Sequence, residues 1–459
     1  MHPSAASLRV IKRRDGAMQD WLTKPAAEQG RAIGRGDLDP LALTEAYLAA
    51  ASAHPEAGRI YARLTESRAL AEAGAASARA RAGLRRGLLD GVPVSWKDLF
   101  DTAGVATEAG SRLLEGRVPT ADAEVLATAT AGGLVCLGKT QMTELAFSGL
   151  GINPMTATPP NVTDPALAPG GSSSGAAVSV GLGLAAAAIG SDTGGSVRLP
   201  AAWNGLVGLK TTHGRLSLEG VVPLALRFDT VGPLARTVED CALLLAALEG
   251  GRPADLTGAQ LKGTRLLVLE GLPFEEAREV PVAAFESAVA RLAEAGAQVD
   301  RRELRIADLA LALAPSLFAP EAYGLWADVI EAAPGRMYPP ILERFRGGQA
   351  VSAPEYVAAW RRLEALRREW AAEVAGHDAV LVPTSPILPP DAARLLADPA
   401  YFATENLLAL RNTRIGNLLG LCALTLPTGV AGTGISLMGA PGQEERLLRL
   451  GHAAEAALG

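Results

Sequence analysis

The stretch APGGSSSGAAVSVGLGLAAAAIGSDTGGSVRLP, residues 168–200, joins two glycine- and serine-rich turns through one apolar segment. Within it, residues 175–183 are typical of a short helix and residues 184–189 of a buried strand. The first turn sets three serines between glycines, so several hydroxyl groups can approach a bound molecule closely. The strand then leads into residues 193–196, whose N–H groups can converge on one point, as in an oxyanion hole. The stretch therefore predicts an α/β chain with a reactive site at the end of a buried strand.

On either side of this stretch, strands and helices alternate, which predicts helices packed around one sheet. Residues 18–85 are expected to be helical, and residues 282–295 form an amphipathic helix. Residues 305–375 are expected to be a helical insertion. Further strands are expected at residues 91–97, 134–137, 265–269, 379–382, 423–426 and 434–438. We expect one domain over residues 60–459, preceded by an N-terminal helical segment at residues 1–59.

The charge of the chain gives no sign of a nucleic-acid partner. Its 459 residues include 43 basic and 49 acidic side chains, for a net charge of −6, and neither sign forms a long run. A nucleic-acid surface would need clustered positive charge. The short basic run at residues 12–14 is better interpreted as a solvated terminus. The five histidines are scattered and form no zinc-binding motif, so we expect no metal and no cofactor.

Cysteine usage and hydropathy favour the cytoplasm. An odd number of widely spaced cysteines excludes a disulfide framework, and the three are Cys136, Cys241 and Cys422. No apolar run that could serve as a signal peptide precedes Asp15. The most apolar segment, residues 178–189, contains two glycines and is too short to span a bilayer. The sequence thus predicts a cytoplasmic protein without a membrane partner.

The turn at residues 170–175 has two other interpretations. A phosphate-binding loop of the Walker type needs lysine and then serine or threonine after its last glycine, whereas Ala176 and Ala177 stand there. The turn also fits the G-x-S-x-G pattern of α/β-hydrolases, centred on Ser173. That pattern needs a preceding strand, which the prolines within residues 165–169 exclude. An esterase of the α/β-hydrolase type that uses Ser173 is therefore a remote alternative.

Three motifs together resemble the amidase signature family. They are GVPVSWKDLFDTAG at residues 91–104, GGSSSG at residues 170–175 and GGSVR at residues 194–198. Lys97 precedes Ser172 by 75 residues, and Ser172 precedes Ser196 by 24, which agrees with the family's spacing. The resemblance extends over about residues 60–459. It implies a single domain with one mixed sheet sandwiched between helices.

The resemblance implies a catalytic triad of Lys97, Ser172 and Ser196. Ser196 is expected to be the nucleophile, and Ser172 a bridging serine joined to Gly171 by a cis peptide bond. Lys97 is expected to be the general base, which requires a neutral amine and hence burial that lowers its pKa. A proton would pass from Ser196 through Ser172 to Lys97 and return to the leaving amine. By itself Lys97 is a weak signal, because a lone lysine after a strand is more often exposed.

The same resemblance implies roles for residues around the triad. Four backbone N–H groups are expected to form the oxyanion hole, those of Thr193, Gly194, Gly195 and Ser196. Ser173 is expected to support Lys97, and Asp192 and Arg198 to form a structural ion pair. The family's acyl pocket implies substrate contacts from Phe147, Gly149, Leu150 and Gly171. Glu144, in the same loop, is expected to be structural.

The resemblance implies hydrolysis of a C–N acyl bond through an acyl-enzyme intermediate. The apolar loop around Phe147 favours a small apolar or aromatic amide or carbamate (urethane), and esters share the same chemistry. The alternative within the family is the glutaminase (A) subunit of a tRNA-dependent amidotransferase. Its members usually carry a Ser/Thr-rich run that residues 147–156 lack. A free-standing hydrolase is therefore favoured, with a homodimer among its possible states and residues 305–345 as a mobile wall of the substrate entrance.

Overall fold

Strand β4 (Ala187–Ser191) runs through the interior of the sheet, and all of its residues are buried. It pairs in parallel with β2 (Pro93–Lys97) and antiparallel with β6 (Val231–Ala235). Helix α7 (Ser174–Gly181) packs against β4 and its neighbours, which the small alanine side chains of β4 allow. The short helix and buried strand expected from residues 175–189 are thus confirmed.

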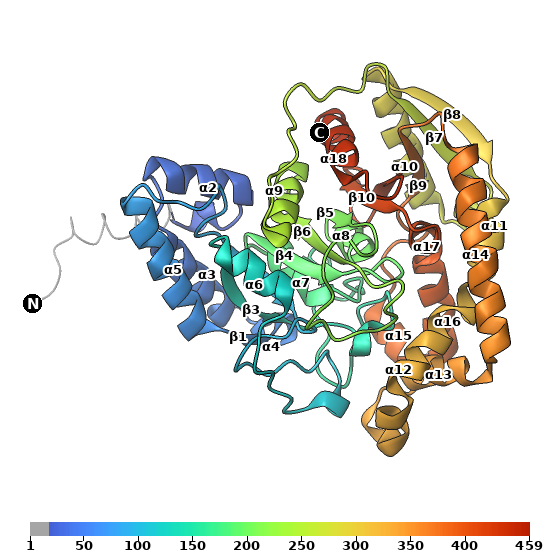
Figure 1. Cartoon of the computed structure of the whole chain (residues 1–459), viewed down its shortest axis with the longest axis horizontal. Helices are drawn as coiled ribbons and strands as arrows, with labels where there is room; N and C mark the ends of the chain where they lie inside the picture. The colour runs from blue at the N-terminus through green and yellow to red at the C-terminus, as the bar shows by residue number, and fades with distance from the viewer. Residues whose placement is uncertain (1–17) are drawn as a thin grey trace, which may run out of the picture.

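The structure, a computed structural model shown in Figure 1, describes residues 18–459. The expectations about the basic run at residues 12–14 and about the segment before Asp15 lie outside these residues. Among the residues described, no helix combines the length and the apolar character that crossing a bilayer requires.

One mixed sheet of 11 strands carries the fold, in the order β1-β3-β2-β4-β6-β5-β10-β11-β9-β7-β8. Parallel pairs join β3, β2 and β4 near one end and β9, β7 and β8 at the other. Antiparallel pairs connect these two groups through β6, β5, β10 and β11, and β1 adds antiparallel to β3. The remaining strands are β1 (Tyr61–Leu64), β3 (Val135–Thr140), β5 (Val207–Lys210), β7 (Arg265–Glu270), β8 (Gln298–Glu303), β9 (Ala379–Pro383), β10 (Cys422–Pro427) and β11 (Gly434–Gly439).

Helices cover both faces of the sheet, with α2, α3 and α5 at one end and α11 to α14 toward the other (Figure 1). Helix α18 packs on α9 and α10 and on β10 and β11. Helix α9 packs on β5 and β6, α10 packs on β8, β9 and β11, and α8 packs on β5, β10 and β11. The remaining helices are α2 (Ala26–Arg35), α3 (Pro40–Ala53), α4 (Ala57–Ile60), α5 (Glu66–Arg81), α6 (Glu124–Ala131), α8 (Arg198–Trp203), α9 (Val238–Glu249), α10 (Glu279–Glu294), α11 (Ile306–Leu311), α12 (Phe318–Ala332), α13 (Pro339–Arg346), α14 (Ala353–Glu373), α15 (Ala392–Ala397), α16 (Pro399–Ala409), α17 (Arg411–Leu418) and α18 (Glu444–Leu458).

Four strands were not foreseen from the sequence. β1 interrupts the segment 18–85, expected to be helical, because its four residues pair with the edge of β3. β5 contains a glycine, and β6 contains a glycine and a proline, which weaken the local strand signal. β8, with the polar sequence QVDRRE, lies at the edge of the sheet, where it need not be apolar.

The expected insertion is helical and consists of α11 to α14. Its aromatic residues do not all face the solvent. Trp326 is only 8% exposed, and its Nε1 donates to the carbonyl of Pro223 at 2.9 Å. Phe318, at the start of α12, packs against Phe228 with ring centroids 4.3 Å apart. The insertion is therefore anchored in the core as well as bordering the cavity described below.

Candidate active site

Lys97 ends β2, a strand in which every residue is buried. Its Nζ donates to the Oγ atoms of Ser172 and Ser191, each at 2.7 Å. Burial lowers the pKa of Lys97 from 10.5 to about 7, although the charges of Asp229 and Asp192 act in the opposite direction. At neutral pH a substantial fraction of this amine is therefore uncharged and can accept a proton.

Ser172 follows Gly171 through a cis peptide bond, as the family resemblance implies. The N–H of Gly171 donates to the carbonyl of Gly149 at 2.6 Å. A Cβ at position 171 would lie 2.8 Å from the backbone of Gly151, so only glycine fits there. These contacts hold the turn that carries the Ser172 hydroxyl next to Lys97.

The turn after β4 exposes backbone N–H groups beside Ser196. Its centre, Gly195, has a φ of 132°, a conformation that favours glycine. The N–H of Gly195, expected in the oxyanion hole, instead donates to Asp192 Oδ1 at 2.8 Å. Within residues 18–459, the N–H groups of Thr193, Gly194 and Ser196 find no acceptor. The structure thus offers three N–H groups, not four, for a developing oxyanion.

A buried ion pair stabilises this turn. Asp192 and Arg198 lie 3.0 Å apart, both fully buried, as expected from the family resemblance. Asn417, on α17, donates to Asp192 Oδ1 at 2.8 Å and accepts from Arg198 at 2.6 Å. Burial would raise the pKa of Asp192, but the charge and hydrogen bonds of Arg198 hold it well below its usual value. Asp192 is therefore ionised, and it fixes the turn by accepting from the N–H groups of Gly195, Val197 and Arg198.

Asp229 holds the other side of the same turn. Its Oδ1 accepts from Thr193 Oγ1 at 2.5 Å, and its Oδ2 accepts from the N–H groups of Leu224 and Ala225. Burial raises the pKa of Asp229 to about 6, although these hydrogen bonds oppose the rise. The ring of His213 contacts the carbonyl of Asp229 at 3.1 Å.

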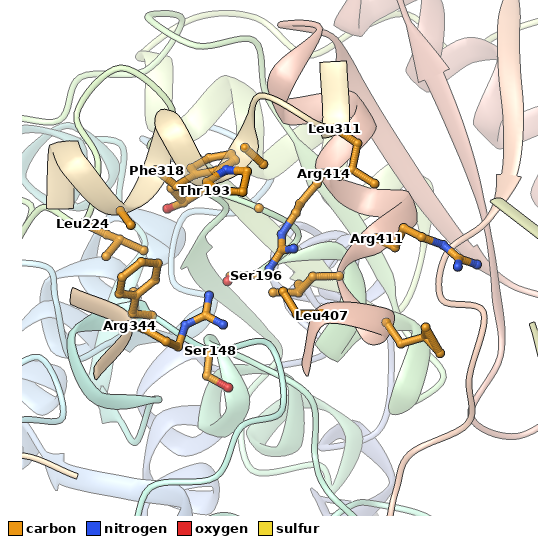
Figure 2. Close-up of a pocket in the computed structure, with 18 of the residues that line it drawn as sticks. Ser148, Thr193, Ser196, Leu224, Leu311, Phe318, Arg344, Leu407, Arg411 and Arg414 are labelled. Carbon is orange, nitrogen blue, oxygen red and sulfur yellow. The ribbon is translucent and has the colours of Figure 1, made fainter. Parts of the chain in front are cut away.

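A cavity of about 520 Å³ opens onto Ser196. Its wall combines the turn after β4 with the loop at residues 146–148, the insertion and helices α16 and α17. Figure 2 shows Ser196 at the base of this space, with Arg344 and Arg414 pointing toward it. The lining residues are Ala146, Phe147, Ser148, Thr193, Gly194, Ser196, Leu224, Glu276, Leu311, Ala314, Pro315, Phe318, Ala319, Arg344, Leu407, Leu408, Leu410, Arg411 and Arg414.

Comparison with known proteins identifies the family of the chain. The family model named Amidase matches residues 42–448. The chain belongs to the amidase family. It is 39% identical to 2-amino-5-chloromuconic acid deaminase of Comamonas testosteroni, over 81% of this chain and 83% of that protein. It is 34% identical to the A subunit of glutamyl-tRNA(Gln) amidotransferase from Chloroflexus aurantiacus, over 94% of this chain and 96% of that protein. A crystal structure of an amidase matches with a TM-score of 0.85 at 33% identity, and the match covers 95% of this chain and 100% of that one.

Amidase-family membership confirms the mixed sheet expected from the sequence and makes this chain a member of a family of enzymes that act on C–N bonds. The described residues hold no group of three or more histidine, cysteine or acidic side chains that could bind a metal ion. The remote α/β-hydrolase alternative finds no support. Ser173 is fully buried, and among residues 18–459 the hydrogen bonds of its Oγ are those with the backbone of Ser191.

The residues expected to contact substrate in this amidase fall into two groups. Phe147 lines the cavity. Gly149, Leu150 and Gly171 are not among the lining residues: Leu150 is fully buried, and the N–H of Gly149 donates to Asn406. Ser173 contacts Ser191 and reaches Lys97 only through it.

Glu144 has the contacts of a structural residue. Its carboxylate accepts from Ser111 Oγ and from the N–H of Tyr338, each at 2.8 Å, which ties its loop to the insertion. Burial raises its pKa to about 7.

Sequence reasoning missed four residues of the candidate site. Ser191 is the second acceptor of the Lys97 amine, and Asp229 anchors Thr193. Arg344 and Arg414 enter the cavity from α13 and α17. The sequence alone could have indicated Ser191, because this residue ends the buried strand β4 as Lys97 ends β2. The other three are brought to the site only by the tertiary fold.

Proposed function

We propose that this chain is a free-standing amidase that hydrolyses small amides by acyl transfer to Ser196, with Ser172 as proton relay and Lys97 as base. One observation carries the proposal: the buried amine of Lys97, whose pKa is about 7, donates to Ser172 Oγ at 2.7 Å. A lysine serves as a base only when it is neutral near the working pH, and few lysines in proteins are.

The proposed reaction uses these groups in turn. Ser196 attacks the acyl carbon of a substrate in the cavity, and its proton passes through Ser172 to neutral Lys97. The N–H groups of Thr193, Gly194 and Ser196 stabilise the oxyanion of the tetrahedral intermediate. The intermediate breaks its C–N bond when the proton returns from Lys97 to the leaving amine. Water then cleaves the acyl-enzyme by the same proton path.

The two carboxylates near Lys97 tune its basicity. Burial alone would push the pKa of Lys97 further down, and the charges of Asp229 and Asp192 raise it again. A base with a pKa near the working pH combines a large neutral fraction with adequate proton affinity. Both carboxylates also hold the turn that carries Ser196, so charge and geometry at the site are linked.

A glutaminase is the second candidate, because the chain resembles the A subunit of glutamyl-tRNA(Gln) amidotransferase over 94% of its length. Glutamine carries an ammonium group that needs a carboxylate partner. Among the lining residues the only acid is Glu276, which is exposed. The mainly apolar wall therefore favours the free-standing amidase. Carbamates and esters share its tetrahedral chemistry and belong to the same proposal. The buried free cysteines agree with a reducing compartment, for which we propose the cytoplasm.

The test is release of the leaving amine by the purified chain alone: an arylamine from aryl acylamides, and ammonia from primary aliphatic amides, O-alkyl carbamates and glutamine. We expect hydrolysis of at least one amide or carbamate, poor turnover of glutamine, and complete loss in Ser196→Ala. Preferential turnover of glutamine that requires an added partner protein would replace this proposal with the glutaminase alternative.

A further inference from the structure

Two arginines from separate helices converge on the cavity in front of Ser196. Arg344 lies near the end of α13, and Arg414 lies on α17. Figure 2 shows both guanidinium groups pointing into the space beside Ser196. The Cγ and Nε atoms of Arg414 come within 3.6 and 3.9 Å of the position that a Cβ on Gly194 would occupy. Arg414 therefore covers the turn that presents the free N–H groups.

Neither guanidinium has an acidic partner. No carboxylate of residues 18–459 lies within ion-pair distance of Arg344 or Arg414, and neither side chain donates a hydrogen bond to another described residue. The Nε of Arg344 is buried without an acceptor, and its guanidinium lies over the ring of Phe147, 4.6 Å from the centroid. Arg198, by contrast, is fully buried and is paired with Asp192.

The surroundings of the two side chains disfavour their charge. Burial lowers the pKa of Arg344 to about 9, with a further contribution from the charge of Arg414, and burial lowers the pKa of Arg414 to about 10. Two like charges held together in a partly desolvated space are destabilising unless an anion joins them. Most of the remaining lining residues are apolar and include Leu224 and Phe318, and the one acid among them, Glu276, is exposed and forms no ion pair with either arginine.

We propose that the amide substrate carries a carboxylate group, which binds between Arg344 and Arg414. The inference rests on the proposed amidase function and adds a charged group to the small apolar or aromatic substrate expected from the sequence. A carboxylate matches the planar donor fork of arginine and can accept from both side chains at once. The apolar walls then hold the short carbon chain or ring that links this carboxylate to the amide.

Arg411 supplies a matched control. It borders the same cavity and lies on the same helix as Arg414, but Figure 2 shows its guanidinium pointing away from Ser196. Its Nη2 instead donates to the carbonyl of Pro273 at 3.3 Å. Arg411→Gln therefore removes a neighbouring positive charge without altering the proposed carboxylate site.

The experiment compares pairs of amides that differ in one group. Succinamic, glutaramic, adipamic and 4-carbamoylbenzoic acids are each paired with the amide in which a methyl group replaces the carboxylate. We expect a higher kcat/KM for at least one acid than for its neutral partner. Arg344→Gln and Arg414→Gln should each lower kcat/KM for that acid about 10- to 100-fold, mainly through KM, since charged hydrogen bonds contribute about 1.5–3 kcal/mol. The neutral partner should change little, and Arg411→Gln should keep the preference for the acid.

Because both cations are unpaired, the glutamine variants should melt no lower than the wild type. Should either fail to fold, Arg344→Lys and Arg414→Lys, which keep the charge without the fork, should weaken the preference for the acid. Equal turnover of acids and neutral partners, or an unchanged preference in both variants, would overturn the carboxylate site and leave the amidase function standing. Turnover of aryl acylamides with no turnover of any acid would do the same. Turnover that survives Ser196→Ala would overturn both.

Discussion

Lowering the pH should inactivate this enzyme through protonation of one residue, Lys97. Burial lowers the pKa of Lys97 from 10.5 to about 7. Below that pH the amine carries a proton, donates to Ser172 and can accept nothing from Ser196. The logarithm of kcat/KM should therefore fall with a slope of one on the acid side, since this quantity reports the free enzyme.

The pKa sets the size of the effect. With a value of about 7, half of the Lys97 amine is neutral at pH 7, roughly 1% at pH 5 and nearly all at pH 9. The assay is kcat/KM for one neutral amide in buffers of constant ionic strength from pH 5 to 9.5. Replacing the base, in Lys97→Ala, should reduce kcat by about 10²–10⁴-fold at pH 9, where Lys97 is neutral, and the difference from the wild type should narrow toward pH 5.

The ring of His213 lies against the backbone of Asp229, so its effect on the acid limb has to be separated from that of Lys97. His213→Asn is therefore the necessary control. If Lys97 is the base, the inflection stays in this variant. An inflection that disappears in His213→Asn, or an acid limb that persists with full activity in Lys97→Ala, would refute the reasoning.

Three further predictions concern the groups around Lys97. Lys97→Met should raise the free energy of unfolding, measured in urea at pH 7, by a few kcal/mol. The shift of the Lys97 pKa from 10.5 to about 7 corresponds to a destabilisation of about 4–5 kcal/mol, which the substitution removes. The two serine hydroxyls left without a donor reduce this gain by about 1–2 kcal/mol. This gain should shrink toward pH 10, because the unfolded lysine then also loses its proton, and a gain independent of pH would contradict the assignment. Asp229→Asn should lower kcat about tenfold, because Thr193 loses its charged hydrogen-bond partner. It should also move the acid inflection of kcat/KM to lower pH, since the charge of Asp229 raises the pKa of Lys97. An unmoved inflection would show that this charge is screened. Asp192→Asn should lower the melting temperature sharply, because loss of one partner of a buried ion pair costs about 3–5 kcal/mol, and a melting temperature like that of the wild type would show that Arg198 finds another partner.

The sequence predicted those parts of the fold whose signals are local. The apolar run before Ser191 indicated β4, and the helical period of the apolar residues indicated α10. β1 and β8 were not predicted, because a short or polar strand forms only through its pairing with a neighbouring strand of the sheet. These contacts join segments that are distant in the chain, and no local pattern encodes them.

The residues of the candidate site also differ in how far the local sequence predicts them. Lys97, Ser172 and Ser196 lie in glycine-rich motifs that are recognisable at fixed spacing. Arg344 lies within the run ERFR of α13, which is typical of a charged helix surface. Its neighbour Arg346 does face outward and pairs with Glu331, whereas Arg344 enters the cavity. Successive helix positions differ by about 100°, so only the packing of the helix shows which arginine faces the substrate.

The most direct test of the central claim is to identify the residue that becomes acylated. The purified chain is treated with a fluorophosphonate, and the modified peptide is mapped by mass spectrometry. The account predicts a single adduct on Ser196, formed with loss of amidase activity and much more slowly in Lys97→Ala. An adduct on Ser173 or another residue, with Ser196 unmodified and activity lost, would contradict it.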